Sequence, residues 1–544
     1  MLGLMQDRPL LISSFLDYAE RYHGDTEIVT RTLEGPIHRY GYADCAARTR
    51  KLAKALIGLG VVPGMRVATL AWNTHRHLEL WFGISGMGAV THTVNPRLYP
   101  GQIEYIINHA EDTYLFLDPS FVELVEGMQE RLETVKGYVI LTDADHMPKT
   151  RLDPVFCYED LLAAQDDDYR WPEFDENTAC GMCYTSGTTG HPKGVIYSHR
   201  ANVLHTMMAM SRESLGISCR ETVMPVVPMF HANSWGIPYA CTASGAKLVL
   251  PGMGMDGESL YQLLDSEKVS ATAAVPTVWL ALLRHLEKTG KMLPHLNMVC
   301  IGGSACPRAM IEIFQTKYDV RVLHAWGMTE TSPLGSVATF KPAMFDLPLD
   351  KQLDIQAKQG RAVYGIEIRI VDDDGREVTR DGKTAGHLQV RGPWVARAYF
   401  KGEGGDILDQ NGWFDTGDIA NMDADGFIQI TDRAKDVIKS GGEWISSIDL
   451  ENLAVGHPDV AEAAVIGVPH PKWAERPLLI VVRAPGSAVT GPEILDYMRG
   501  RIAKWWLPDD VVFIDELPHT ATGKLLKTKL REDFRDYRLP GAAQ

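Results

Sequence analysis

Segments with helical periodicity alternate with short apolar runs through the first half of the 544-residue chain. Ser14 is a candidate N-cap for a helix that would end at Gly24. Apolar residues keep helical spacing from 52 to 59, Gly60 follows them, and residues 67–72 then form a strand-like run. Strands that alternate with helices pair in parallel, so this half predicts parallel sheets covered by helices.

The pattern changes at about residue 360, where short strand-like runs between Gly and Asp turns predict a small β-rich subdomain. These runs cover residues 366–371, 387–390 and 427–431. A compact unit begins near residue 433, and its ~110 residues are enough for a separate domain. Its expected elements are strands at 460–468, 478–483 and 511–514 and a helix at 494–504. The expected fold is therefore α/β, with a large N-terminal domain over 1–432 and a small, mobile α+β domain over 433–544.

The chain carries a net charge of −16 and has a pI of about 5.6, which disfavours nucleic acid and anionic membranes as partners. Its eight cysteines are scattered, and Cys180 and Cys183 lie in an apolar run, so we expect buried thiols and no disulfide framework. Asp7 and Arg8 precede any long apolar run, and no stretch of ~20 apolar residues could span a membrane. A cytoplasmic protein is expected.

The segment from Thr185 to Gly194 is the most informative in the chain. It follows an apolar run, precedes a β-like run, and holds three glycines, four hydroxyl side chains and Lys193. Glycines allow backbone N–H groups to turn toward a ligand, and this combination suits a polyphosphate. The segment is not a Walker A loop, because Gly194 follows Lys193 where that loop needs Ser or Thr. The alternative is a Gly- and Thr-rich hairpin without a ligand.

A second segment, residues 324–331, places a flat aromatic ring, a hydroxyl and a carboxylate close together. Trp326 can stack on a purine. Glu330 can hold Mg²⁺, which takes few protein ligands when phosphates are present. The alternative is a buried tryptophan beside an ordinary surface glutamate.

Two further segments lie toward the C-terminus. Asp418 can accept hydrogen bonds from both ribose hydroxyls, and Arg433 can donate to them, while residues 439–443 form a Gly-rich loop with N–H groups for a ligand. Lys524 lies on a turn before the last helix. Taken singly, each segment is as well explained by a β-turn or by a capped helix with a solvated lysine.

In this order and spacing, the four segments resemble the adenylate-forming superfamily of acyl-CoA synthetases, adenylation domains and beetle luciferases. The resemblance extends over almost the whole chain. It implies an enzyme that uses ATP, Mg²⁺ and coenzyme A to convert a small carboxylic acid first to an acyl-adenylate and then to a thioester. Three alternatives are an adenylating enzyme that loads a carrier protein, a luciferase-like oxygenase and a catalytically inactive paralogue.

The resemblance also implies a role for each motif residue. The ATP phosphates would be held by Thr185, Ser186, Gly187, Thr188, Thr189, Gly190 and Lys193. The rest of the nucleotide would be held by Gly303, Ser304, Ala305, Trp326, Gly327, Met328, Thr329, Asp418 and Arg433. Mg²⁺ would lie at Thr185 and Glu330. The catalytic residues would be Lys524, Glu330 and His231, the last beside the substrate carboxylate.

A second arrangement of the C-terminal domain is implied for the coenzyme A step. In the superfamily that domain rotates about a hinge, which matches Lys435. The pantetheine tunnel would then be lined by Lys439, Ser440, Gly441, Gly442, Glu443 and Trp444. A homodimer is expected by analogy.

The acyl pocket implied by the resemblance consists of Trp235, Gly302, Trp326 and Pro333. Trp326 stands where tyrosine is usual, and two indoles leave less room than the Gly or Ala of long-chain enzymes. Residues 231–235, 470–477 and 504–508 resemble a subgroup that contains bacterial 3-methylmercaptopropionate–CoA ligases and short- and medium-chain fatty acyl-CoA ligases. We therefore expect 3-methylmercaptopropionate as substrate, with short- or medium-chain fatty acids as the alternative.

Overall fold

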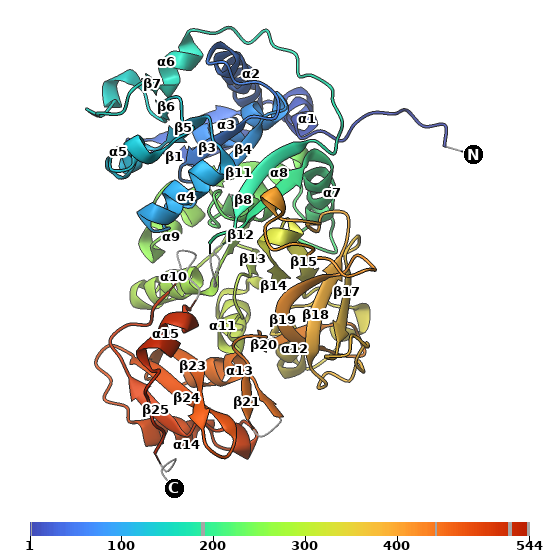
Figure 1. The fold of residues 1–544 in the computed structure, drawn as a ribbon, viewed down its shortest axis with the longest axis vertical. Helices are drawn as coiled ribbons and strands as arrows, with labels where there is room; N and C mark the ends of the chain where they lie inside the picture. Colours follow the sequence, from blue (N-terminus) through green and yellow to red (C-terminus); the bar gives the residue numbers. More distant parts are fainter. Residues whose placement is uncertain (2, 186–190, 441–442, 520–524, 541–544) are drawn as a thin grey trace.

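The computed structural model describes residues 1, 3–185, 191–440, 443–519 and 525–540. Two large sheets with helices around them form the bulk of the molecule, a small antiparallel sheet lies beside them, and a C-terminal unit has its own sheet (Figure 1). The α/β fold predicted from the alternation of helices and strands is confirmed. Within the described ranges, no helix is both long enough and apolar enough to cross a membrane.

The first large sheet has seven strands in the order β7-β6-β5-β3-β4-β8-β9. All neighbours pair in parallel except β8 and β9, which form an antiparallel hairpin. The hairpin therefore brings Thr185 and Lys193 together at one end of the sheet. The strands are β3 (Arg66–Leu70), β4 (Val90–Thr93), β5 (Tyr114–Leu117), β6 (Tyr138–Ile140), β7 (Val155–Cys157), β8 (Ala179–Tyr184) and β9 (Gly194–Ser198).

The second large sheet has nine strands in the order β16-β15-β14-β13-β12-β10-β11-β1-β2. Its six central strands are parallel, and β2, β15 and β16 extend it in antiparallel fashion at the two edges. The strands are β1 (Glu27–Arg31), β2 (Ile37–Gly41), β10 (Thr222–Pro225), β11 (Lys247–Leu250), β12 (Ala271–Ala274), β13 (Met298–Ile301), β14 (Arg321–Gly327), β15 (Leu334–Val337) and β16 (Arg361–Ala362).

Helix α3 (His75–Gly86) joins the two large sheets, because it packs against β3, β4 and β8 of one and β1 of the other. All twelve of its residues are buried, as expected for a helix covered on every side. The other helices of this part are α1 (Ser13–His23), α2 (Tyr42–Gly58), α4 (Pro100–Ala110), α5 (Val122–Glu126), α6 (Tyr158–Ala163), α7 (His199–Met210), α8 (Ile237–Ser244), α9 (Gly257–Ser266), α10 (Pro276–Thr289), α11 (Arg308–Tyr318) and α12 (Leu349–Gln356).

The small antiparallel sheet consists of β17 (Glu367–Val371), β18 (Gly386–Arg391), β19 (Phe414–Met422) and β20 (Ile428–Arg433). After β20 a turn leads into the C-terminal unit, which has two apolar clusters of its own, one on each face of its sheet. Its elements are β21 (Ile438–Ser440), β22 (Glu443–Ile445), α13 (Ser447–Val455), β23 (Val460–His470), β24 (Ala474–Arg483), α14 (Gly491–Met498), β25 (Asp510–Phe513) and α15 (Lys527–Asp533).

Two local predictions were wrong, and one strand was missed. Ser14 does not cap α1, because its hydroxyl donates to the Leu11 carbonyl (2.6 Å) and Ile12 occupies the N-cap position. The helix expected to reach residue 504 ends at Met498, shortly before Gly500 takes a left-handed backbone at φ 75°. Strand β19 was missed, because its Asp-Thr-Gly-Asp sequence hides the alternation of a strand.

Other local predictions were confirmed. Helix α1 ends before Gly24, α2 ends just before Gly60, and the run at 67–72 forms most of β3. Cys180 and Cys183 are buried in β8, and none of the eight cysteines, all of them described, forms a disulfide.

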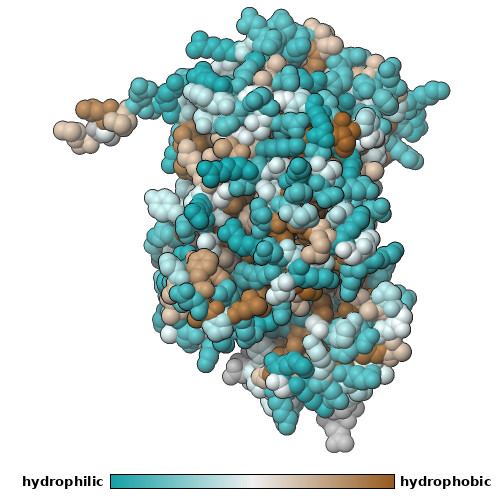
Figure 2. All heavy atoms as spheres, turned by 180° about the vertical axis from the view of Figure 1, so that it is seen from behind, coloured by the Kyte–Doolittle hydropathy of each residue, from teal (hydrophilic) through white to brown (hydrophobic). Residues whose placement is uncertain are grey.

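Seen from behind, the surface is mostly hydrophilic, and the segment before α1 projects from the body (Figure 2).

Candidate active site

A cavity of about 580 Å³ lies where the β8–β9 hairpin, the C-terminal ends of β13 and β14, and strand β19 meet. Active sites in α/β proteins commonly form at the carboxyl ends of parallel strands. The predicted site residues that line it are Thr185, Lys193, His231, Trp235, Gly302, Gly303, Trp326, Gly327, Met328, Thr329, Glu330, Pro333 and Arg433.

The remaining predicted residues fall into three groups. Ser304, Ala305, Asp418, Lys435, Lys439 and Ser440 are described but do not line the cavity. Ser186, Gly187, Thr188, Thr189, Gly190, Gly441, Gly442 and Lys524 lie outside the described residues. Glu443 and Trp444 are described only as backbone of β22, paired with β21.

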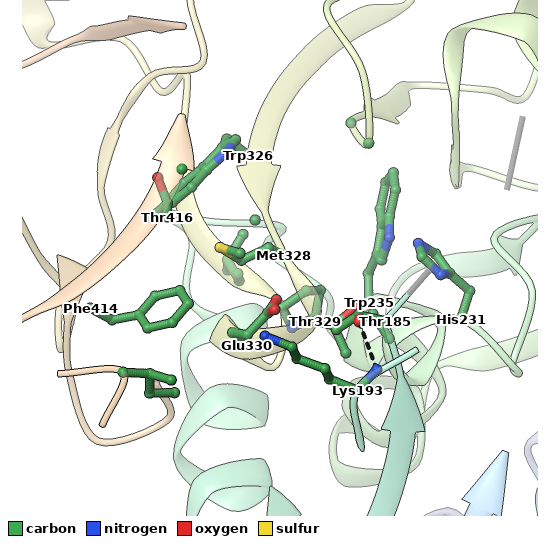
Figure 3. Close-up of a pocket in the computed structure, with 18 of the residues that line it drawn as sticks. Thr185, Lys193, His231, Trp235, Trp326, Met328, Thr329, Glu330, Phe414 and Thr416 are labelled. Carbon is green, nitrogen blue, oxygen red and sulfur yellow. Dashed lines mark hydrogen bonds between the residues drawn. The ribbon is translucent and has the colours of Figure 1, made fainter. Parts of the chain in front are cut away.

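Thr185 and Lys193, which lie on either side of the predicted phosphate-binding residues, are held together next to the β8–β9 hairpin. The Thr185 amide donates to the Lys193 carbonyl (2.9 Å), and the Lys193 amide donates to Thr185 Oγ1 (3.2 Å). The Lys193 side chain points across the cavity toward Glu330 (Figure 3). An amine and a hydroxyl are thereby held at one end of the cavity, which is the chemistry that suits phosphate oxygens.

Glu330 lies in the 3-10 turn η5 (Thr329–Thr331) just after β14, and its side chain is buried at the cavity wall. Its Oε1 accepts a hydrogen bond from the Tyr399 hydroxyl (2.6 Å), and its backbone carbonyl accepts one from the Ala396 amide (2.7 Å). A single carboxylate beside a phosphate site fits Mg²⁺, whose other ligands are then phosphate oxygens and water.

Asp418 on β19 does not line the cavity itself, but it holds two residues that do, Trp326 and Arg433. Its Oδ2 accepts from the Trp326 indole N–H (3.1 Å), and its Oδ1 pairs with Arg433 Nε (2.9 Å). Arg433 also donates to the Thr416 carbonyl (3.2 Å). A β-carbon at Gly335, on the neighbouring strand β15, would collide with the Trp326 ring, so glycine allows the indole to lie flat there.

Trp235 reaches the cavity from an unusual turn. The five residues from Ala232 to Gly236 all have left-handed backbones, with φ between 41° and 72°. For residues other than glycine such a backbone costs roughly 1–2 kcal/mol each, so surrounding contacts must hold the turn. The Ser234 hydroxyl donates to the Val227 carbonyl (2.6 Å), and a β-carbon at Gly236 would lie 2.6 Å from the His205 ring.

The two indoles that were expected to share an acyl pocket lie in different parts of the cavity. Trp235 lies beside His231, whereas Trp326 lies near Thr416 (Figure 3). A β-carbon at Gly302 would be 3.1 Å from Trp235 Cη2, so the indole rests against a glycine. The geometry therefore favours Trp235 as an acyl wall and Trp326 as part of the nucleotide end.

The described residues of the predicted coenzyme A loop belong to the C-terminal sheet. The Lys439 amide donates to Glu475 Oε2 (2.9 Å), and Arg476 donates to the Ser440 hydroxyl (3.3 Å). Both partners lie on β24. The structure thus anchors this hairpin within the C-terminal unit and does not bring Lys439 or Ser440 to the cavity.

The predicted hinge residue, Lys435, lies in the turn between β20 and β21. The Arg433 carbonyl accepts from the amides of Asp436 (2.8 Å) and Val437 (2.9 Å). On either side of this turn the two units also touch, because Asp432 Oδ2 accepts from the Ser447 amide at the start of α13 (2.8 Å). Any rotation about Lys435 would have to break that contact.

Tyr399 and Asp432 were not singled out by the sequence analysis. The Tyr399 hydroxyl meets Glu330 across 69 residues of chain, and Asp432 meets Ser447 across 15. No local pattern marks either residue, since the partner becomes a neighbour only when the chain folds.

Comparison with known proteins identifies the class. Residues 15–400 match the family described as AMP-binding enzyme, and residues 449–524 match the AMP-binding enzyme C-terminal domain. The chain belongs to this family, and membership of the adenylate-forming superfamily is confirmed.

Several curated relatives match nearly the whole chain. The 3-methylmercaptopropionyl-CoA ligase of Ruegeria lacuscaerulensis is 51% identical, over 98% of this chain and 99% of its own. The medium-chain fatty acid–CoA ligase of Ectopseudomonas oleovorans is 47% identical, over 98% of each. The long-chain fatty acid–CoA ligase of Thermus thermophilus is 46% identical, over 98% and 97%. Among solved structures, the anthranilate CoA ligase AuaEII with anthranoyl-AMP shares the fold, with a TM-score of 0.87, 24% identity and 98% coverage of both chains.

Proposed function

We propose that this chain is an ATP-dependent acyl-CoA ligase that acts on a short carboxylic acid, 3-methylmercaptopropionate. Two kinds of support agree. Relatives named for this reaction match nearly the full chain at about half identity. The cavity brings together Thr185 and Lys193, which suit phosphate, and Arg433, which suits a ribose. It also holds Trp235, whose indole lies beside His231 and against Gly302.

The first half-reaction joins the acid to AMP. The substrate carboxylate oxygen attacks the α-phosphorus of ATP, a new phosphorus–oxygen bond forms, and pyrophosphate leaves with the electron pair of the broken bond. Lys193, Thr329 and Lys524 would stabilise the charge that develops on the phosphate oxygens. Glu330 and Thr185 would hold Mg²⁺, which when bound neutralises phosphate charge.

The second half-reaction makes the thioester. The sulfur of coenzyme A attacks the acyl carbonyl, the thiol proton is released, and AMP leaves as the carbon–oxygen bond to phosphate breaks. We propose that the C-terminal unit first turns about Lys435, which would bring residues 439–444 to the cavity and withdraw Lys524. By analogy with the family, we also propose that the protein is a homodimer in the cytoplasm.

The substrate proposal rests on Trp235. A methylthio group suits an indole wall, because sulfur–aromatic contacts contribute ~0.3–1.5 kcal/mol. One extra methylene in an apolar pocket changes discrimination by only about 1–3 kcal/mol. Butyrate to hexanoate should therefore be used as well, and the medium-chain relative makes a short- or medium-chain fatty acid the second candidate.

The deciding experiment supplies ATP, Mg²⁺ and one acid at a time, from acetate to dodecanoate plus 3-methylmercaptopropionate, with and without coenzyme A. We expect pyrophosphate release with short acids, and AMP and thioester only when coenzyme A is present. Thioester formation on a carrier protein but not on coenzyme A would contradict the proposal, as would a preference for twelve-carbon chains.

Replacing Trp235 with alanine is expected to move the optimum of kcat/KM toward longer acids. Removing the indole opens space against Gly302, so chains that now meet the wall can enter. The gain for dodecanoate relative to butyrate should be at least tenfold, about 1.4 kcal/mol. An unshifted profile for this variant would exclude Trp235 from the acyl wall.

Trp326→Phe is expected to raise the KM for ATP by about tenfold, because hydrogen bonds to charged groups contribute about 1.5–3 kcal/mol. The variant keeps a ring above Gly335 but removes the donor to Asp418. With 3′-deoxy-ATP, which lacks one of the hydroxyls that Asp418 would hold, the effect should be much smaller. The acid profile should not move; if it does, Trp326 lines the acyl pocket after all.

A further inference from the structure

Tyr399 links the two oppositely charged side chains of the phosphate end. It lies just before the 3-10 turn η7 (Phe400–Gly402) and lines the cavity. Its hydroxyl donates to Glu330 Oε1 at 2.6 Å. The Lys193 Nζ lies over its ring, 4.9 Å from the ring centre.

Tyr399 gives each of the two charged groups a partner: its ring lies under the Lys193 amine, and its hydroxyl binds the Glu330 carboxylate. Lys193 points toward Glu330 (Figure 3), and a direct ion pair between them would neutralise the groups that phosphate and a cation need. Within the described part of the chain, the amine instead meets the ring face of Tyr399, and the carboxylate meets its hydroxyl. A ring face attracts a cation without neutralising it.

The segment that carries Tyr399 is itself held in place. The Ala396 amide donates to the Glu330 carbonyl (2.7 Å), which ties the segment to η5. Further along, the Tyr105 hydroxyl on α4 donates to Glu403 (3.1 Å), and Lys401 pairs with Glu111 (2.7 Å). With contacts on both sides of it, Tyr399 has a defined position relative to both partners.

We propose that Tyr399 is a positioning residue for the metal and phosphate end of the site, its hydroxyl orienting Glu330 toward Mg²⁺ and its ring orienting Lys193 toward phosphate. The inference rests on the proposed function, in which Glu330 holds the metal. It concerns a residue that touches the binding groups and not the reacting atoms.

Tyr399→Phe separates the two roles, because phenylalanine keeps the ring and loses the hydroxyl. We expect the Mg²⁺ concentration for half-maximal pyrophosphate release to rise about tenfold, the scale of one hydrogen bond to a charged group. The KM for ATP at saturating Mg²⁺ and thioester formation from supplied acyl-adenylate should not change. Tyr399→Leu, which also removes the ring, should raise the KM for ATP as well.

A binding measurement tests the inference without catalysis. Mn²⁺ is titrated into the full-length protein with a non-hydrolysable α,β-methylene ATP and no acid, and free Mn²⁺ is followed by electron paramagnetic resonance. Tyr399→Phe should weaken Mn²⁺ binding by the same factor as it shifts the Mg²⁺ dependence. This readout remains valid even if every tested acid fails as a substrate, so failure of the proposed function is a separate result.

Two controls make the outcome decisive. Tyr114→Phe removes another tyrosine hydroxyl, which donates to the Leu59 carbonyl, and neither residue lines the cavity, so the Mn²⁺ titration should not change. In a Glu330→Gln background, Tyr399→Phe should add no further loss, because both changes act on one carboxylate. An unchanged titration for a folded Tyr399→Phe protein would overturn the inference, and so would a full additive effect in the Glu330→Gln background.

Discussion

Replacing Lys524 with alanine is expected to lower acyl-adenylate formation by roughly 10²–10³, the usual effect of losing one preorganised transition-state donor. Thioester formation from supplied acyl-adenylate should be nearly unchanged, because the lysine would have left the cavity by that step. Lys524 lies outside the described residues, so this expectation rests on its motif and on the match of residues 449–524 to the C-terminal domain of the family.

The control for this variant has to be chosen from the structure. Lys527 is close in sequence, but it is buried and pairs with Glu451 (2.7 Å). Burial raises the pKa of Glu451 to about 7, and the charge of Lys527 opposes this rise. Removing Lys527 would leave a buried carboxylate and destabilise the C-terminal unit. Lys529 is exposed and, among the described residues, its ion pair is with Asp533 on the same helix face (2.6 Å), so Lys529→Ala is the matched control.

Pyrophosphate release without coenzyme A measures the first half-reaction, and thioester formation from synthetic acyl-adenylate measures the second. Lys529→Ala should match the natural enzyme in both. Equal losses in the two half-reactions for Lys524→Ala would remove this lysine from its adenylation role.

Lys435→Pro is expected to block thioester formation, with a drop of more than about 10², while acyl-adenylate formation stays within about tenfold of the natural rate. Proline fixes φ at its own position and disfavours the helical region for Ala434, so the turn after Arg433 can no longer rearrange freely. The measurement compares single-turnover pyrophosphate release with thioester formation in the same preparation.

The contacts across this turn sharpen the prediction. Asp432 accepts from the Ser447 amide, and the Ser446 hydroxyl donates to the Thr431 carbonyl, so α13 is fastened to β20 in the arrangement described. A rotation about Lys435 must undo both. Lys435→Ala leaves the backbone free and should support both half-reactions. A proline variant that makes thioester at the normal rate would place the pivot elsewhere.

The sequence alone determined the class of fold and the strands that flank the proposed phosphate-binding segment. Periodicity and turn residues are local properties, so alternating helices and strands predicted the parallel sheets. The apolar run, the glycines and the β-like run around Thr185–Lys193 likewise predicted a strand-flanked loop, which is the β8–β9 hairpin. Periodicity did not identify strand β19, because this strand contains polar residues that bond to neighbouring elements. Asp418, for example, accepts a hydrogen bond from Trp326 on β14.

Only the tertiary structure decided which side chains work together. The sequence placed both Trp235 and Trp326 in one acyl pocket. The left-handed turn at residues 232–236 and the absence of a side chain at Gly335, where a β-carbon would meet the Trp326 ring, instead place the two indoles in different parts of one cavity. Trp326 meets Asp418 across 92 residues, and Tyr399 meets Glu330 across 69. These pairs form because segments far apart in the sequence pack around one cavity, and the distance between two side chains after that packing is not encoded in any local pattern.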